Sequence, residues 1–239
     1  MQAPLHTVAL RLDWATHQAA VAAITRWHYS HSLPPQPHVR VGVWEAGKFV
    51  GVVLFSRGAS TDLLTPYGLG QQEGCELTRV ALREHASAVT RIVALSLKFL
   101  KKQCPALRLV VSFADPAHGH HGGIYQGGGW IYSGTTLPDQ AFLGPDGKRW
   151  HSRTISSTGK RKMFGKVRKV WRRDQCTRIN TPGKHRYLMP LDEEMRQRIA
   201  KLAKPYPKRP RVGSDTVDTP EVHSGEGGSI PTPTLHPEK

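Results

Sequence analysis

The first half of the chain switches between two periods of apolar and polar positions. Alternation at every second position predicts strands, and apolar residues spaced three or four apart predict helices. A β-hairpin is expected where two apolar runs flank the short connection of residues 45–48. The expected strands are residues 8–12, 39–44, 49–55, 75–80, 107–113 and 130–132, and the expected helices are residues 14–27, capped by Asp13, and 87–104.

In the second half, short apolar pieces are separated by turns and by basic residues. The pattern predicts two short strands around a Gly-Pro-Asp-Gly turn, a short helix within a basic stretch, a closing strand and a last amphipathic helix. These elements are expected at residues 141–143, 150–151, 167–173, 184–189 and 192–204. Residues 205–239 hold almost no large apolar side chain, so we expect a disordered tail after one domain of residues 1–204.

The order of these elements predicts the fold class. The middle strands follow one another closely and are expected to be antiparallel, while the long helix crosses over to the buried strand of residues 107–113. This is the arrangement of an α/β protein similar to the GNAT acetyltransferases, with a mixed, mostly antiparallel central sheet and flanking helices. A splayed sheet of that kind forms a cleft, but the fold alone does not specify the activity.

The composition adds information on location and binding partners. No apolar run approaches the roughly 20 residues that a membrane helix needs, no secretory signal is evident, and the three cysteines are isolated, which favours a reducing compartment. The formal net charge is +16, and it predicts attraction to polyanions. The basic segment of residues 148–186 is expected to contact nucleic-acid phosphates through Lys148, Arg149, Arg153, Lys160, Arg161, Lys162, Lys166, Arg168, Arg172 and Arg173.

The chemistry is expected near Asp115, which follows the buried strand and precedes a proline. Open α/β sheets usually place their reactive groups at such a strand end. Three histidines, His118, His120 and His121, crowd the glycine-rich loop that follows. Asp115 has a second interpretation, because Asp before Pro commonly caps a turn. The convergence of so many titratable groups favours the functional interpretation.

Several segments taken together resemble the Mom family of bacteriophage DNA-modification proteins. The resemblance covers about residues 10–190, and its parts are Arg26-Trp27-His28-Tyr29-Ser30, Glu76-Leu77-Thr78-Arg79-Val80, Phe113-Ala114-Asp115-Pro116, Gly122-Gly123-Ile124-Tyr125-Gln126 and Gly129-Trp130. It implies a GNAT-like fold and the conversion of adenine in double-stranded DNA to N6-carbamoylmethyladenine, which protects the DNA from restriction. It also implies a location in the cytoplasm of the bacterial host.

One departure from the acetyltransferase pattern concerns the donor. Those enzymes hold the pyrophosphate of coenzyme A on a glycine-rich turn before the long helix. Here that turn, residues 80–86, contains no glycine, and Glu84 would repel a phosphate. We therefore expect no tightly bound cofactor, and glycyl-tRNA rather than acetyl-CoA as the donor, because a carbamoylmethyl group has the atoms of a glycine amide.

The candidate catalytic residues follow from this hypothesis. Asp115, or His28 with Tyr29, would be the general base for the weakly nucleophilic adenine amine. Arg79 would bind the donor phosphate or the developing oxyanion, unless it pairs with Glu76. Tyr125 and Trp130 would stack on an extruded adenine, although Trp130 also suits a core position. The remaining expected substrate contacts are Ser30, Glu76 and Ser112.

Three alternatives stay open. His118, His120 and His121 with Asp115 would suit a non-haem iron site. A non-catalytic DNA-binding protein would explain the basic segment but not the polar cleft residues. An ordinary N-acetyltransferase that uses acetyl-CoA would explain the fold but neither the charge nor the missing glycine turn. The sequence does not specify the oligomeric state.

Overall fold

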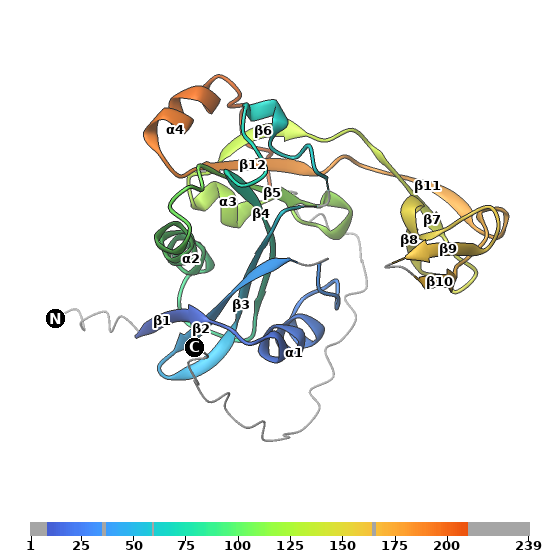
Figure 1. Cartoon of the computed structure of the whole chain (residues 1–239), viewed down its shortest axis with the longest axis horizontal. Helices are drawn as coiled ribbons and strands as arrows, with labels where there is room; N and C mark the ends of the chain where they lie inside the picture. The colour runs from blue at the N-terminus through green and yellow to red at the C-terminus, as the bar shows by residue number, and fades with distance from the viewer. Residues whose placement is uncertain (1–8, 35–36, 59, 164–165, 210–239) are drawn as a thin grey trace.

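The computed structural model describes residues 9–34, 37–58, 60–163 and 166–209. Its centre is a seven-stranded sheet with the order β1-β2-β3-β4-β5-β12-β6, in which β4 and β5 are parallel and all other neighbours are antiparallel (Figure 1). The strands are β1 (Leu10–Trp14), β2 (His38–Glu45), β3 (Lys48–Ser56), β4 (Gly74–Leu82), β5 (Leu109–Ala114), β6 (Ile131–Thr135) and β12 (His185–Pro190). The expected mixed, mostly antiparallel central sheet is confirmed.

Helices cover both faces of this sheet. Helix α2 (Val89–Gln103) packs on the face formed by residues such as Val53 and Val110, whereas α1 (His17–Trp27) packs on the opposite face beside Leu54. Helix α4 (Glu193–Ala200) covers that second face further along the sheet, against β5 and β12. Neighbouring residues of β3 and β5 thus serve two cores, as expected for a sheet buried on both sides.

The start of α1 differs from the expectation. Strand β1 continues to Trp14, which pairs with Val41, so Asp13 lies within the strand and cannot cap the helix. Thr16 is the cap instead, since its hydroxyl oxygen accepts a 3.1 Å hydrogen bond from the Ala19 amide. Residue 8, the expected start of the first strand, lies outside the described residues.

Strands β4 and β5 are hydrogen-bonded over only part of their length and then diverge. They pair from Gly74 and Leu109 as far as Leu77 and Ser112. Beyond that point β4 follows β3 as far as Leu82, whereas β5 follows β12. Thr78 is an extra residue on β4, because Leu77 and Arg79 pair with consecutive residues of β3. Such a bulge bends the strand and redirects side chains. The divergence opens the sheet at the carboxyl ends of both strands.

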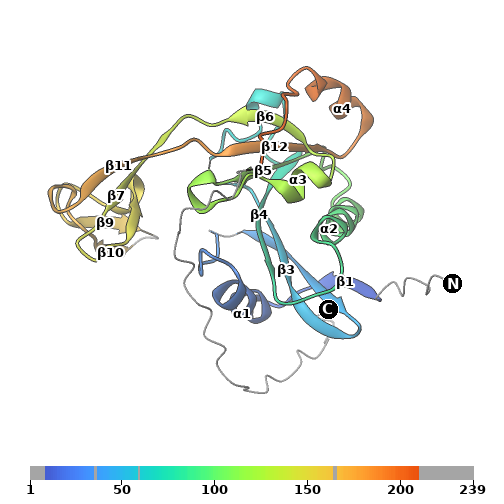
Figure 2. The same cartoon turned by 180° about the vertical axis from the view of Figure 1, so that it is seen from behind.

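A small basic lobe projects from one end of the molecule (Figures 1 and 2). It contains a three-stranded sheet, β11-β7-β8, and the two-stranded ribbon β9-β10. Its strands are β7 (Asp139–Leu143), β8 (Arg149–His151), β9 (Lys160–Met163), β10 (Lys166–Lys169) and β11 (Thr177–Thr181). Phe142 and Ile155 form its buried centre. The prediction of a helix at residues 167–173 is wrong. Residues 166–169 form β10, which pairs with β9, and Val167 is exposed to solvent rather than packed against a core as in an amphipathic helix.

The lobe is inserted in a β-hairpin. Strands β6 and β12 are antiparallel neighbours, and the chain runs from one to the other through the whole lobe. At the point of insertion the Thr136 amide donates to the Lys184 carbonyl oxygen (2.9 Å), and the Lys184 amide donates to the Thr136 hydroxyl oxygen (2.9 Å). The lobe therefore leaves and re-enters the main sheet at adjacent positions.

The chain continues to pack beyond residue 204, where the expected domain ends. The Tyr206 hydroxyl donates to the Trp130 carbonyl oxygen (2.7 Å), and the side-chain amide of Gln126 donates to the Pro207 carbonyl oxygen (3.2 Å). Residues 210–239, the larger part of the expected tail, lie outside the described residues. Within the described part of the chain, every helix is too short or too polar to cross a membrane.

Candidate active-site cleft

A cavity of about 610 Å³ lies between the diverging ends of β4 and β5. The loop after α1, the second half of β4, the end of β5 and the loop after it all contribute to its lining. The cavity brings together all five residues that the sequence proposed as catalytic, along with two of the three loop histidines. These are His28, Tyr29, Arg79, Asp115, Tyr125, His120 and His121. Their catalytic roles stay predictions, but their convergence is a property of the fold.

Asp115 caps a turn, as one of its two interpretations predicted, and it also borders the cavity. Its Oδ1 accepts a 3.0 Å hydrogen bond from the Ala117 amide and so caps the short 3-10 turn η2 (Pro116–His118). Its Oδ2 lies 3.3 Å from Nδ1 of His118 and 3.9 Å from Nζ of Lys184. The side chain is 16% exposed, so it is shielded yet borders the cavity. One oxygen anchors the carboxylate while the other remains among polar groups.

His28 is held in one tautomer. Its ring is buried, and its Nδ1 accepts a 3.1 Å hydrogen bond from the Ser30 amide. Burial, reinforced by the charges of Arg79 and His120, lowers the pKa of His28 to about 4. The ring is therefore neutral near pH 7, and its proton resides on Nε2. A ring in this state donates a hydrogen bond from Nε2 rather than accepting a proton there. Ser30 thus orients His28 from outside the cavity lining.

Tyr29 forms an exposed aromatic surface at the cleft. Its side chain is 51% exposed, and its ring centroid lies 4.4 Å from that of His28, 4.8 Å from His118 and 5.0 Å from His120. Although half of Tyr29 is exposed, the partial burial of the residue raises the pKa of its hydroxyl, so this group stays protonated at neutral pH. A protonated phenol cannot serve as a general base, whereas an exposed ring among imidazoles suits stacking on a nucleobase.

Arg79 supplies a cation within the cleft. It follows the bulged Thr78 on β4, and its guanidinium donates to the carbonyl oxygens of Thr78 (2.7 Å) and Ser32 (3.3 Å). Burial lowers its pKa, while nearby Tyr29 and Glu76 act in the opposite direction. An arginine remains charged at neutral pH in any case. Two of its donors are fixed by the backbone, which positions the group without neutralising it.

The floor of the cleft is a buried hydroxyl chain. The Tyr125 hydroxyl donates to the Ser112 oxygen (2.7 Å), and Ser112 donates to the Leu77 carbonyl oxygen (2.8 Å). Burial raises the pKa of Tyr125 to about 12. Trp130 is 1% exposed and packs beneath Tyr125 with ring centroids 5.0 Å apart. Stacking on a base is therefore blocked for Trp130, which belongs to the core.

Two other expected substrate contacts also lie away from the cavity lining. Ser112 is fully buried below Tyr125, and Glu76 is absent from the lining. Strand alternation explains the position of Glu76: its neighbour Leu77 points into the core, so Glu76 points to the opposite face of β4. The sequence pattern located the correct strands but not the faces on which these side chains lie.

Contacts that the sequence did not predict hold the histidine loop. Residues Gly123–Gly127 form the short helix α3 rather than an irregular segment. The Tyr187 hydroxyl donates to the His121 carbonyl oxygen (2.6 Å). Gly122 has a φ of 85°, and a Cβ there would lie 2.3 Å from the Tyr187 ring, so only glycine fits. Tyr187 comes from the distant strand β12, which explains why local sequence patterns missed it.

The histidines do not form a metal site in this arrangement. Among the residues that the structure describes, no three His, Cys, Asp or Glu side chains are grouped so that they could hold one metal ion. The donor set of Asp115, His118, His120 and His121 thus does not converge on one point.

The turn before α2 is occupied by a side chain of the protein itself. Both carboxylate oxygens of Glu45, at the end of β2, accept hydrogen bonds, from the amides of Ala86 (2.7 Å) and Ser87 (2.8 Å). Glu45 is 8% exposed. In acetyltransferases the backbone amides of this turn hold the pyrophosphate of coenzyme A. Here a carboxylate has taken two of those donors, so the turn does not fit that cofactor.

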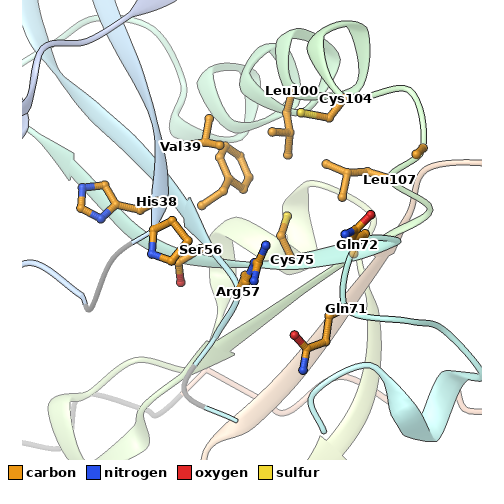
Figure 3. A pocket seen from close by; sticks show the side chains of 14 residues that line it. His38, Val39, Ser56, Arg57, Gln71, Gln72, Cys75, Leu100, Cys104 and Leu107 are labelled. Carbon is orange, nitrogen blue, oxygen red and sulfur yellow. The ribbon is translucent and has the colours of Figure 1, made fainter. Parts of the chain in front are cut away.

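A second, mostly apolar cavity of about 360 Å³ lies at the other end of the β4–β5 pair (Figure 3). Leu100, Leu107 and Cys75 line its interior, and Arg57 lies among the polar residues of its lining. Burial raises the pKa of the Cys75 thiol to about 12, so this thiol is unreactive at neutral pH. All the catalytic candidates lie in the first cavity rather than here.

Comparison with known proteins gives a family match. Residues 9–208 match the Mom protein family. No curated protein matches the chain. Among solved structures, a spermidine N-acetyltransferase from Vibrio cholerae is similar over 76% of this chain and 93% of its own, with 9% identity and a TM-score of 0.43.

Two further structures are similar at the same level. An acetyltransferase from Bacillus subtilis, solved in complex with CoA, shares 12% identity over 77% of this chain and 99% of its own, with a TM-score of 0.41. An N-acyl amino acid synthase from uncultured soil microbes shares 9% identity over 82% of this chain and 98% of its own, with a TM-score of 0.42.

Proposed function

The chain belongs to the Mom protein family, and from this premise we propose that it converts adenine in DNA to N6-carbamoylmethyladenine and thereby protects the DNA from restriction. A transferase that acts in DNA modification follows from the family; the product and the donor are our proposal. The observation that carries it is the cleft, where the Asp115 carboxylate, an exposed Tyr29 ring and the Arg79 cation border one cavity.

We propose glycyl-tRNA as the donor. The bond between Glu45 and the turn before α2 supports a donor that needs no pyrophosphate anchor there. A net charge of +16 is suited to two nucleic-acid substrates. An ester of glycine already contains both carbons, the oxygen and the nitrogen that the modified base acquires.

The proposed chemistry proceeds in two steps. First, the exocyclic nitrogen of adenine attacks the glycyl ester carbonyl, its proton passes to a base, and the ribose hydroxyl of the tRNA leaves. Second, the free glycyl amine attacks C6 of the adenine through a five-membered ring, and the bond from C6 to the original nitrogen breaks. That nitrogen takes up the proton that the glycyl amine loses and becomes the carbamoyl nitrogen, so all heavy atoms of adenine and the glycyl group are retained.

The cleft residues then take distinct roles. Asp115 accepts the proton of the attacking amine, because Tyr29 is protonated and His28 carries its proton on Nε2. Arg79 and Nε2 of His28 donate to the oxygen that becomes negative during acyl transfer. Tyr29 stacks on the extruded adenine, which is unreachable inside the duplex. Tyr125, with its bonded hydroxyl, shapes the floor.

The test is expression in a bacterium, followed by digestion of total DNA to nucleosides and mass spectrometry. We expect a deoxyadenosine that is heavier by one glycyl residue, and no such product from the Asp115→Asn variant. Isotope-labelled glycine charged onto tRNA should transfer its label to DNA with purified protein. Retained activity after removal of all tRNA would refute the donor, and loss with a chelator that iron restores would favour the metal alternative.

A further inference from the structure

The ribbon β9-β10 of the basic lobe has two unlike faces. Directly opposed residues of an antiparallel pair point to the same side, and consecutive residues point to opposite sides. The pairs Lys160–Lys169 and Lys162–Val167 therefore form one face. The pair Arg161–Arg168 lies on the other face.

The second face is turned toward the body of the lobe at its β9 end. There the Arg161 guanidinium donates to the carbonyl oxygen of Ile155 (3.2 Å), and Ile155 is 1% exposed. The first face, with Lys160, Lys162, Val167 and Lys169, consequently points away from the lobe. We call these four residues the outer face of the ribbon.

The outer face combines charge with an unusual apolar group. All three lysines are exposed, and within the described part of the chain none of them forms an ion pair with a carboxylate. Val167 is 68% exposed between them. Other basic residues of the lobe are engaged: Arg172 pairs with Asp174, and Arg173 lies over the Phe142 ring (5.6 Å). Unpaired lysines can also protect an edge strand from aggregation, but that use does not call for an exposed valine.

We propose that the outer face of β9-β10 enters the major groove of duplex DNA, where Lys160, Lys162 and Lys169 contact phosphates and Val167 contacts thymine methyl groups. The major groove of B-form DNA, about 12 Å wide, admits a two-stranded ribbon. The A-form major groove of RNA is too deep and narrow for side chains to read, so duplex DNA fits better than tRNA. This inference rests on the proposed function, which makes DNA the substrate.

The position of the lobe suits this partner. It projects from the same end of the molecule as the loop that follows β5, as both views show (Figures 1 and 2). Lys184, at the base of the lobe, reaches to within 3.9 Å of Asp115. A duplex held by the ribbon would thus lie on the side of the cleft, where an extruded base could enter.

Binding of the full-length protein to fluorescent duplexes tests the proposal without any turnover. Replacing Lys160, Lys162 and Lys169 with Ala should reduce the slope of log affinity against log salt by about 2.7, or about 0.9 per phosphate contact. The matched control replaces the exposed body lysines Lys48, Lys98 and Lys102 and should leave the slope unchanged. Equal effects in the two triple variants would overturn the proposal.

The groove is identified by the base methyl group. Uracil in place of thymine removes a methyl group from the major groove alone, and should weaken wild-type binding by about threefold per contact. Val167→Ser should bind both duplexes equally. Displacement by a minor-groove ligand with no effect of uracil, or a larger loss of tRNA than of DNA binding in the lysine variant, would overturn the proposal. A chain that binds as expected but yields no modified nucleoside would refute the proposed function alone.

Discussion

The cleft and the basic lobe treat their polar side chains in opposite ways. In the cleft, Asp115, His28 and Arg79 each form a hydrogen bond with a backbone group, and the surrounding protein partly shields them. On the outer face of the lobe, the lysines extend into solvent without such partners among the described residues. Fixed groups need no reorganisation during a reaction, whereas mobile charges adapt to a polyanion of any sequence.

This contrast predicts a separation of function. Changes in the cleft should impair chemistry and leave DNA affinity intact, whereas changes in the lobe should impair affinity and leave the chemistry intact. The hairpin insertion supports such a division, because the seven-stranded sheet contains no strand from the lobe. Four experiments test this separation.

The largest effect is expected from Asp115→Asn. Asn keeps an oxygen that can accept the Ala117 amide, so the turn should survive, but it cannot take a proton at neutral pH. Loss of a general base should lower the rate of modification by roughly 10²–10⁴-fold. DNA affinity should match the wild type, and the exposed Asp62→Asn serves as the control. Normal modification by Asp115→Asn would leave this residue with only a capping role.

Removal of the lobe should have the next largest effect, on binding. Residues 137–183 hold twelve Lys and Arg residues against three acidic ones, which is over half of the net charge of +16. An Asn-Gly turn in their place should close the β6–β12 hairpin, since Thr136 and Lys184 are already hydrogen-bonded. Duplex affinity near 0.1 M salt should fall on the order of 10²-fold.

Two further measurements show whether the shortened chain still folds and still carries out the chemistry. Thermal unfolding should remain cooperative, and a short single-stranded substrate supplied at high concentration should still be modified. A shortened chain that folds but modifies no substrate would show that the lobe takes part in the chemistry, and the comparison between the two regions would fail.

Tyr29→Ala should produce an intermediate effect on adenine capture. Loss of one stacking platform costs about 1–3 kcal/mol per base, or roughly 5- to 150-fold in affinity. The measurement is binding to duplexes whose target adenine is unpaired, compared with fully paired duplexes. Tyr29→Phe keeps the ring and is the matched control. If both variants lose modification while adenine binding is unchanged, the hydroxyl rather than the ring is what matters.

The smallest effect concerns pH. Because burial lowers the pKa of His28 from 6.5 to about 4, the unfolded chain binds more protons than the folded one between these values. Stability should therefore fall as the pH drops from 6.5 toward 4, and His28→Gln should reduce that dependence in Tm measured against pH. The rate of modification should show no ionisation of His28 near pH 6.5. An acid limb at that pH that disappears in His28→Gln would contradict the assigned tautomer.

The sequence was informative where local pattern decides structure. The hairpin of β2 and β3, the long helix α2 and the buried strand β5 follow from periodicity and from Pro105. Asp115, Arg79, His28 and Tyr29 were selected from the sequence, and all four line the cavity because each lies near the end of an element or at its bulge. The lobe was misread at residues 167–173, because a solvent-exposed ribbon shows no apolar alternation.

Contacts between distant elements could not be predicted from local pattern. Tyr187 is hydrogen-bonded to the histidine loop, and Glu45 is hydrogen-bonded to the turn before α2. Both contacts join residues more than 40 positions apart in the sequence. Trp130 was proposed as a stacking surface, yet it is buried and packs against Tyr125. The bulge at Thr78 determines which side chains of β4 point into the cleft, and no local sequence pattern predicts this bulge.

The hydrogen bonds between Thr136 and Lys184 bear on how such proteins can diversify. A segment whose two ends are adjacent can lengthen, shorten or be exchanged without altering the register of the sheet from which it emerges. Selection on the inserted segment can then change which DNA is bound without changing the part of the fold that forms the cleft. Chimaeras that exchange residues 137–183 between family members would show whether target preference travels with the insertion.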